Sequence, residues 1–566
     1  MLLTFGAPPA APFEASPSDV LSAMPGNVPF ALAVRNPSEF ESRVSALSEH
    51  LGIPVRPFTL AKGWLRIVEG LDEQRSAGVA LLPGASESHA GSPLLLLPTT
   101  DFEALTRYLR PRPAAQGLTE LSLRSRSAFA AQRGPYTLIG SNPEAVQAAT
   151  TAMISLGERL SPGSRRLWNQ SDLFVCVDVA SCLRPTAGRA ETGQPWGSEL
   201  LLRLAERVER LHAGFSVVAD GLQATLLLSP RGPRNRTNEA SESREVLDDR
   251  LLATVTNLPS ALEFVGDAEC AAAFLDGWQY VLPVLERMAG GLRAGESEKL
   301  AEMIRDAAAG LSSFALALSL EENDGSNGLV VAKLVRFDQN ADHLQQYVEN
   351  VSGFLSREPF VDSQWNVAAK RVSFRPAAES IAGLTVDQLV LDLTAFHDER
   401  ADMLKRLLAT DRLVVRLATA EMGEARYSVA TLGGTSGSFE RLVNQLRGTS
   451  TEARPTSEPW VPSAANPQRP LARGSFTLAE LTRLAAVWSG PVGEADRPSP
   501  TQTDPARATF VVYESPDATV RAELTVPQET LKELQRFLLN RLAKGTSRDG
   551  PDSSPPPDFP QTLEKR

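Results

Sequence analysis

The chain has 566 residues, and at a typical length of about 150 residues per domain this predicts about four folding units. Its net charge of −11 is the opposite of the basic surface that binds a phosphate backbone, so we expect no nucleic-acid partner. Apolar runs such as Leu94–Leu97 are far shorter than the roughly 18 residues of a membrane-spanning helix, so we expect no membrane insertion.

Cysteine usage and the first residues leave the compartment open. Cys176, Cys182 and Cys270 form neither a disulfide framework nor a CxxC pair. The first residues carry no basic segment, so the sequence as it stands predicts a cytoplasmic protein. The alternative is an exported or periplasmic protein, because the apolar start and the small residues after Gly6 resemble the end of a signal truncated by a late start codon. In-frame DNA upstream of Met1 should then encode a basic residue and a longer apolar run.

Helix signals recur along the chain. We expect the first long helix to open at Asn36 as the cap, with Pro37 at the first helical position and Glu39 three residues past the cap, and to stop at Gly52. Asn142-Pro143-Glu144 repeats this opening. Apolar stripes at helical spacing predict the faces that pack on a sheet, namely Phe40, Val44, Leu47 and Leu51 in the first helix and Leu531, Leu534, Leu538 and Leu542 in the last.

An internal duplication is predicted from self-similarity. Residues 24–40 align without a gap on residues 258–274, at an offset of 234, and both segments are typical of a strand that leads into a helix. Downstream, Gly78–Leu82 and Phe314–Leu318 are each followed by a polar turn and a second strand, Leu94–Leu97 or Leu329–Val335. We therefore expect residues 20–160 and 248–380 to share one fold.

A shorter pattern, a strand that enters a helix and is followed by a hairpin, occurs three times. It begins at Leu173, at Leu389 and at Gly474. Alternation of apolar and polar residues in its strands, as in Val520–Val526, indicates a sheet with one wet face. The expected fold class is α+β, with tandemly duplicated modules of antiparallel sheet and helices packed on one face.

Polar and breaker-rich stretches set the expected boundaries. The predicted organisation is a flexible N-terminus (1–19), repeat module A1 (20–160), module B1 (161–232), repeat module A2 (244–380), module B2 (381–448), a linker (449–473), module B3 (474–545) and a disordered tail (546–566).

The openings with Pro and Phe, together with strand-to-helix entries such as VCVDVAS and LVLDLTAF, resemble uncharacterised, usually exported proteins of planctomycete-type bacteria. The resemblance covers most of residues 20–545 in pattern. It implies a bacterial protein of repeated strand-helix-hairpin modules and export, and it implies no site and no activity.

Two aspartates are the first candidate site. Asp178 and Asp392 follow strands at corresponding places of two repeats, which allows a paired-carboxylate site or two helix caps, and capping is favoured because Asp accepts hydrogen bonds from first-turn amides. Thr477, near that place in the third repeat, is also a capping type.

A histidine and three carboxylates are the candidate metal ligands. His397, Asp398, Glu399 and Asp402 lie within about one helical turn, but no further ligand motif accompanies them, so a solvated helix start is favoured.

Two loops allow ion binding. Glu321, Glu322, Asp324 and Asn327 form an oxygen-rich turn that lacks the spacing of an EF-hand, so a hairpin tip is favoured over Ca²⁺. Leu432–Leu442 is a Gly-rich loop before a helix, which allows phosphate binding; it has no Lys or GxGxxG, so a turn capped by Ser438 is favoured.

No catalytic set is predicted. Cys176 lies mid-strand among apolar residues, where a thiol is buried and inert. The five histidines share no repeat position, so neither a Ser-His nor a Cys-His pair is proposed; they are His50, His89, His212, His343 and His397.

We therefore expect a non-catalytic structural or interaction protein with duplicated α+β modules, without catalytic, cofactor-binding or metal residues and without a cofactor. Its expected partner is a protein or a component of the cell envelope. The alternative is an unrecognised hydrolase with its site between the two halves, where a cleft would hold perturbed titratable groups.

Overall fold

The structure is a computed structural model. It describes residues 19–182 apart from 53, 84–90, 124–125 and 180; 208–231; 247–267 apart from 257 and 259; 270; 302; 311–337 apart from 324–325; 372–448 apart from 396–398 and 424; 470–489; and 506–545 apart from 515–518. The predicted flexible N-terminus apart from residue 19, nearly all of the predicted linker and the predicted tail lie outside these residues.

The N-terminal half runs from a short helix to a long hairpin. Its elements are α1 (Val20–Ala23), β1 (Phe30–Val34), α2 (Pro37–His50), α3 (Pro57–Leu65), β2 (Ala77–Leu82), β3 (Ser92–Pro98), α4 (Phe102–Thr106), η1 (Arg107–Leu109), β4 (Arg112–Pro113), η2 (Ala115–Gly117), β5 (Thr119–Leu123), β6 (Arg126–Arg133), β7 (Tyr136–Gly140), α5 (Pro143–Thr151), α6 (Leu156–Arg159), α7 (Pro162–Gln170), β8 (Leu173–Asp178), β9 (Val208–Val218) and β10 (Gly221–Pro230).

The C-terminal half begins with a longer helix. Its elements are α10 (Asp249–Thr256), β11 (Leu262–Asp267), β12 (Leu311–Asn323), β13 (Ser326–Phe337), β14 (Val372–Ile381), β15 (Leu384–Asp392), η4 (Leu393–Ala395), α15 (Glu399–Leu408), β16 (Arg412–Met422), β17 (Ala425–Leu432), α16 (Ser436–Arg447), β18 (Pro470–Phe476), α17 (Leu478–Ser489), β19 (Ala508–Glu514), β20 (Val520–Pro527) and α18 (Gln528–Gly545).

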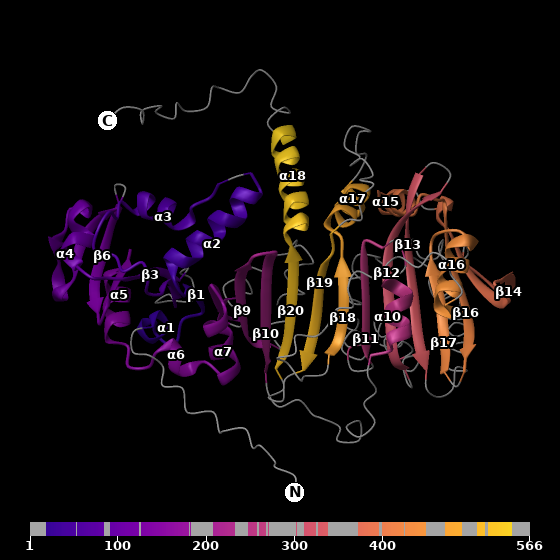
Figure 1. Cartoon of the computed structure of the whole chain (residues 1–566), viewed down its shortest axis with the longest axis horizontal. Coiled ribbons are helices and arrows are strands. Elements are labelled where there is room, and N and C mark those ends of the chain that lie inside the picture. Colours follow the sequence, from indigo (N-terminus) through magenta and orange to yellow (C-terminus); the bar gives the residue numbers. More distant parts are fainter. Residues whose placement is uncertain are drawn as a thin grey trace, which may run out of the picture.

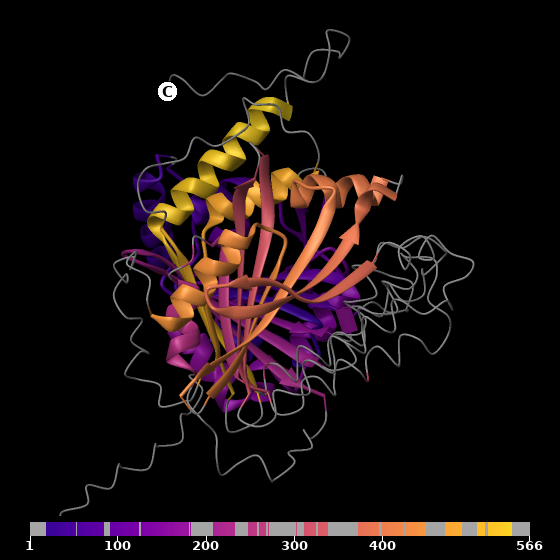
Figure 2. The ribbon, with the colours of Figure 1, turned by 90° about the vertical axis from the view of Figure 1, so that its right-hand side faces the viewer.

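The twenty strands of the described residues belong to one antiparallel sheet. Following the pairings from edge to edge, the order in space is β4-β5-β6-β7-β3-β2-β1-β8-β9-β10 and then β20-β19-β18-β11-β12-β13-β17-β16-β15-β14. Figure 1 shows the strands from β9 to β13 of this order side by side, with β10 and β20 adjacent at the middle of the molecule, and Figure 2 shows the same ribbon turned by 90°. The mixed helix-and-strand class and the antiparallel sheet of the predicted fold are therefore present.

Among the strand pairings of the described residues, the one between β10 and β20 joins the two halves. The backbone N–H of Gln528, the first residue of α18, also donates to Asp220 at 2.8 Å. Eight consecutive residues of each strand are in register, from Gly221 opposite Pro527 to Leu228 opposite Val520. Side chains on one face of this joint are apolar, and they form four direct cross-strand pairs, Leu222–Val526, Ala224–Leu524, Leu226–Ala522 and Leu228–Val520. Such pairs are the unit that stabilises a sheet.

The expectation that helices cover only one face is wrong for the N-terminal half. All five residues of β7 are buried. Its Tyr136 and Leu138 pack in the main core with residues of α1, α5 and α7, whereas Ile139 belongs to a second cluster with Leu105 and Leu109 of α4 and η1. Because successive strand residues point to opposite faces, this half of the sheet has apolar cover on both sides.

Helix openings follow the predicted chemistry. Asn36 accepts a hydrogen bond from the Glu39 backbone at 3.1 Å, and Asn142 accepts one from Ala145 at 3.0 Å. The first of these helices ends at His50, and Gly52 has a φ of +77°, as a helix-terminating glycine requires. The predicted stripe of α2 is only half-buried, so the helix lies at the margin of the core rather than inside it.

Candidate functional site

The two candidate aspartates cap the turns that follow their strands. Asp178 Oδ1 accepts a hydrogen bond from the Ser181 backbone at 2.9 Å, and Asp392 Oδ1 accepts one from the Thr394 backbone at 3.0 Å. These are the bonds that the capping hypothesis requires. The strands β8 and β15 lie in separate halves of the sheet, so the two carboxylates form no paired site.

By position in the sheet, the counterpart of Asp178 is Thr477. The Asp178 backbone N–H donates to Pro29 at 2.8 Å, and the Thr477 backbone N–H donates to Ala261 at 2.9 Å, each just before an inner strand of its half. Asp392 ends β15, which lies at a different place in the order of strands. Asp178 and Thr477 therefore lie at more similar places in the sheet than Asp178 and Asp392 do.

Of the four candidate metal ligands, only Asp402 has a described side chain. Asp402, on the exposed side of α15, forms an ion pair with Lys405 at 3.7 Å, and Glu399 begins that helix. His397 and Asp398 lie outside the described residues. Within the part of the chain that the structure describes, no three His, Cys, Asp or Glu residues converge as metal ligands.

The oxygen-rich turn and the Gly-rich loop meet through Glu321. Its Oε2 accepts a hydrogen bond from Ser438 Oγ at 2.5 Å and lies 2.6 Å from Arg441 Nη2. Both partners of this carboxylate therefore lie in the first turns of α16. Of the other predicted Ca²⁺ ligands, Asp324 lies outside the described residues, and only the backbone of Glu322 and Asn327 is described.

Packing explains the glycines of the loop before α16. Gly433 and Gly434 have φ values of +77° and +68°, and a Cβ on Gly433 would lie 2.4 Å from the Leu329 carbonyl oxygen. Glu321 places a negative charge beside the N-terminus of α16, where phosphate would need positive potential. The loop therefore favours the predicted turn over a phosphate site.

One hydroxyl-imidazole contact was missed by the sequence analysis. Ser164 Oγ on α7 lies 3.1 Å from His212 Nδ1 on β9, and Ser161 Oγ lies 2.9 Å from Ser164 Oγ. His212 also stacks on Phe174, with ring centroids 5.8 Å apart. The two side chains are 48 positions apart, and no motif connects them.

Burial decides the chemistry of this contact. Ser164 and His212 are 1% and 2% exposed. Burial, with a smaller contribution from Arg210, lowers the pKa of His212 to about 4, and burial raises the pKa of Cys176, its cross-strand neighbour, to about 11. Both groups are neutral near pH 7 and closed to substrate, so the contact is structural in this conformation.

In each half a buried tyrosine is linked to the aspartate that caps the first helix. Asp19 caps α1, and its two carboxylate oxygens accept hydrogen bonds from Ser76 Oγ at 3.2 Å and Trp168 Nε1 at 2.6 Å. Ser76 Oγ in turn lies 3.1 Å from Tyr136 Oη. Burial raises the pKa of Asp19, and burial raises the pKa of Tyr136 to about 12.

In the C-terminal half the contact is direct. Tyr427 Oη donates to Asp248 Oδ2 at 2.9 Å, and Asp248 Oδ1 accepts from the backbone of Arg250 at the start of α10. Arg336 Nη1 lies 3.4 Å from the same carboxylate. Burial, followed by the neighbouring Asp248, raises the pKa of Tyr427 to about 12. Each cluster ties the helix before the first strand of its half to the sheet.

Glu263 on β11 is another buried carboxylate that sequence reasoning missed. It is 3% exposed and lies 3.0 Å from Arg507 Nη2. Ser475 Oγ donates to its Oε1 at 2.5 Å, and Ser260 Oγ donates to its Oε2 at 3.0 Å. A buried charge with this many partners is satisfied internally, which makes it part of the core.

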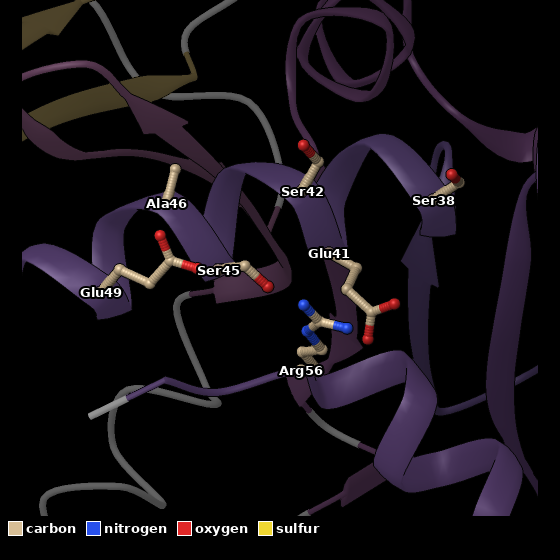
Figure 3. Close-up of a pocket in the computed structure, with 7 residues that line it drawn as sticks. All are labelled: Ser38, Glu41, Ser42, Ser45, Ala46, Glu49 and Arg56. Carbon is tan, nitrogen blue, oxygen red and sulfur yellow. The ribbon is translucent and has the colours of Figure 1, made fainter. Parts of the chain in front are cut away.

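The most accessible candidate surface is formed by α2 and α3. A hollow of about 390 Å³ lies between them, and Figure 3 shows Glu41 and Glu49 of α2 and Arg56 of the α3 cap around it. Serine side chains of α2 complete the lining. Beside it, α3 has no buried residue and exposes Leu60 and Trp64 by 66% and 59%.

Comparison with known proteins identifies no relative: no protein-family model, no curated protein and no solved structure matches the chain. Among the described residues, no helix has the length and apolar character to span a membrane. The assignment of a function therefore depends on the geometry of this chain alone.

Proposed function

We propose that the protein is a non-catalytic interaction protein, and that α2 and α3 form its contact surface. The observation that carries this proposal is α3, a mostly apolar helix that has no fully buried residue and packs on the core only through the half-buried Leu65, while Leu60 and Trp64 are exposed. Large exposed apolar side chains are ordinary when scattered, but a row of them that includes Trp is typical of a contact surface.

The reactive side chains of the described residues support the same proposal by their surroundings. His212 and Ser164 bond to each other inside the core, and Glu263 is paired with Arg507. Asp178 and Asp392 hold backbone amides. Each of these groups has a structural use that explains its position.

We further propose that the two halves are copies of one ten-strand module. The strands of the first half, read in space from β4 to β10, have the same order as the strands of the second half, read from β14 to β20. In this comparison β1 corresponds to β11. Tyr136 and Tyr427 then fall on matching strands, and each is linked to the aspartate that caps the first helix of its half, Tyr427 directly and Tyr136 through Ser76. This organisation divides the chain near residues 231–246.

The proposed copies meet with near two-fold symmetry. His212 pairs with Leu227 in β9–β10, and Thr509 pairs with Thr525 at the corresponding place in β19–β20. Leu227 of β10 therefore corresponds to Thr525 of β20, and two residues earlier in each strand Thr225 corresponds to Glu523. Thr225 and Glu523 also pair with each other across the joint. A contact in which matching residues face each other is the isologous arrangement of a two-fold dimer.

Site-specific photo-crosslinking of the full-length protein in its source cells tests the interaction function. A photoreactive residue at position 60 should give a discrete cross-linked protein band, and the same residue at position 153 should not, although Met153 is 96% exposed. Equal bands from both positions, or none from either, would contradict the proposed surface.

The second candidate function is hydrolysis, and the observation that favours it is the contact between Ser164 and His212. A screen with chromogenic ester, phosphate and glycoside substrates tests it. Turnover by the wild type that is lost in Ser164→Ala and His212→Ala would require the core to open around these residues and would replace the interaction proposal.

A further inference from the structure

One face of the sheet is apolar across three successive rows of cross-strand partners. The middle row crosses β13, β12, β11, β18, β19 and β20 through directly paired residues, which point to the same face: Lys333, Leu316, Phe264, Gly474, Phe510 and Leu524. The two flanking rows run from Val331 to Ala508 and from Val335 to Val512, and they contain only apolar residues and glycine. Lys333 is therefore the one charged residue in these three rows.

The two faces of these strands differ in burial. The face opposite Lys333 packs in the core with α10 and α16, and its Leu334 is fully buried. On the Lys333 face, Leu316, Phe264 and Phe510 are only half-buried, and the rings of Phe264 and Phe510 stack with centroids 6.2 Å apart. The buried residues of the flanking row beside them include Phe314 and Val335. This face thus offers apolar area that the described residues do not fully cover.

The charge of Lys333 is uncompensated among the described residues. Its side chain reaches solvent and has no hydrogen bond or ion pair there, while the surrounding protein atoms partly desolvate the ammonium and lower the pKa of Lys333. Asp387, on the same face, lies three strands away at about 14 Å, and it accepts a hydrogen bond from the Ala377 backbone at 2.8 Å. Farther along β16 and β17, Glu421 and Arg426 pair with each other at 3.4 Å. An anion beside Lys333 would supply the missing partner.

The apolar row extends from Lys333 for the length of a long hydrocarbon chain. Neighbouring strands are about 4.8 Å apart, so Phe510, four strands away, is about 19 Å from Lys333. One acyl chain supplies about 15 Å, half of the hydrocarbon core of a bilayer. A chain that begins at Lys333 therefore crosses Leu316 and Phe264 and ends near Phe510 (Figure 1).

We propose that this face binds a long-chain fatty acid, with its carboxylate at Lys333 and its chain across Leu316, Phe264 and Phe510. One lysine matches the single charge of a carboxylate, whereas a phosphate monoester carries about −1.5 to −2. A single chain can lie flat on the sheet, but the surface of an anionic bilayer would be repelled by the net charge of −11. This site lies in the other half of the sheet from α2 and α3, so it is additional to the contact surface proposed above.

Displacement of a fluorescent fatty acid from the full-length protein tests the proposal. Hexadecanoate should displace the probe at micromolar concentration. Hexadecan-1-ol, which lacks the charge, should bind at least about tenfold more weakly, and octanoate, with eight fewer methylene groups, at least about a hundredfold more weakly. Lys333→Met should weaken hexadecanoate at least about tenfold and leave hexadecan-1-ol unchanged, whereas Lys333→Arg should keep the preference for the carboxylate.

A matched control separates this site from attraction to any lysine. Lys62 lies in the other half and pairs with Glu73, so Lys62→Met should leave every affinity unchanged. Equal affinity for hexadecanoate and hexadecan-1-ol, or equal loss in Lys333→Met and Lys62→Met, would overturn the proposal. Failure of hexadecanoate to bind would do the same and would point to another segment of the chain, or a second copy, on this face. Tighter binding of hexadecyl phosphate than of hexadecanoate would overturn the choice of a carboxylate.

Discussion

His212 is held in the core as a neutral imidazole, because Ser164 satisfies one ring nitrogen and the second has no hydrogen-bond partner among the described residues. A proton on this ring would be a positive charge beside Arg210 without an acceptor. The unfolded chain has no such restriction and takes up the proton at the ordinary pKa of about 6.5.

The first prediction follows from this difference in pKa. With a folded pKa of about 4, His212 contributes stability that is complete above pH 6.5 and is lost as the pH falls towards 4. The loss amounts to about 3 kcal/mol at most. Urea unfolding at pH 7.5, 6, 5 and 4.5 should show the advantage of the wild type over His212→Asn shrinking as the pH falls. A constant difference would mean that this imidazole titrates normally in the folded state.

The second prediction concerns the ion pair between Glu263 and Arg507. Because the carboxylate is 3% exposed, Arg507→Ala leaves a buried charge without its cation, and we expect it to cost about 3–5 kcal/mol of unfolding free energy. The exposed pair Arg426–Glu421 is the control, since Arg426→Ala should cost less than about 1 kcal/mol. Similar small losses in both variants would show that solvent reaches Glu263.

At the scale of the element, strands and helix ends follow local chemistry. The cap at Asn36 and the hairpins of β2–β3 and β12–β13 occur where the sequence predicts them, because turn residues and alternation act within a few positions. The register between the two proposed copies is not predicted in this way. Strand partners in the proposed duplication would match Phe30 with Leu262, whereas the sequence alignment matches it with Phe264. A slip of two residues keeps the same face of a strand, so the apolar pattern alone does not fix it.

The candidate site was less predictable than the fold. Ser164 and His212, or Glu263 and Arg507, come together only through strand pairings between distant segments, and no local pattern encodes them. The apolar residues of α3 were visible in the sequence. Their exposure could not be predicted, because it depends on which other elements of the fold pack beside α2 and α3.

The third prediction belongs to the turn after β8. Asp178→Asn keeps an oxygen for the Ser181 amide and should change the melting temperature little, whereas Asp178→Ala should cost about 1 kcal/mol. The same comparison at Asp392 should give the same ranking, and the two Ala costs should add because the sites are far apart. Equal harm from Asn and Ala, or a midpoint raised by a divalent metal only in the wild type, would indicate a functional carboxylate instead.

At the scale of the whole molecule, the joint between β10 and β20 holds the halves in one sheet. A protease site inserted among residues 232–246, which lie outside the described residues, tests its strength. After cleavage the two fragments should still co-elute in size-exclusion chromatography, because eight paired residues and four apolar cross-strand pairs remain.

The control for this fourth prediction is Thr225→Pro, which removes a ladder hydrogen bond in the middle of a strand. The cleaved Thr225→Pro protein should separate into its two fragments. A proline in an edge strand is tolerated, as Pro376 in β14 shows, because β14 lies at one end of the strand order. Fragments that separate without the Pro substitution would mean that the covalent connection, and not the strand pairing, keeps the halves together.

The central joint also has a consequence for synthesis. The ribosome completes β10 about 300 residues before it completes β20, which at about 5–20 residues per second is a delay of roughly 15–60 s. During that time a folded N-terminal half would present the open edge of β10, with an apolar face that includes Leu222 and Leu226. Neighbouring nascent chains on one messenger RNA would present the same edge, and the proposed two-fold relation of the halves would make two such edges complementary to each other. Slow translation through residues 231–520 should therefore increase aggregation of the newly made protein, and co-expression of a chaperone that binds nascent chains should reduce it.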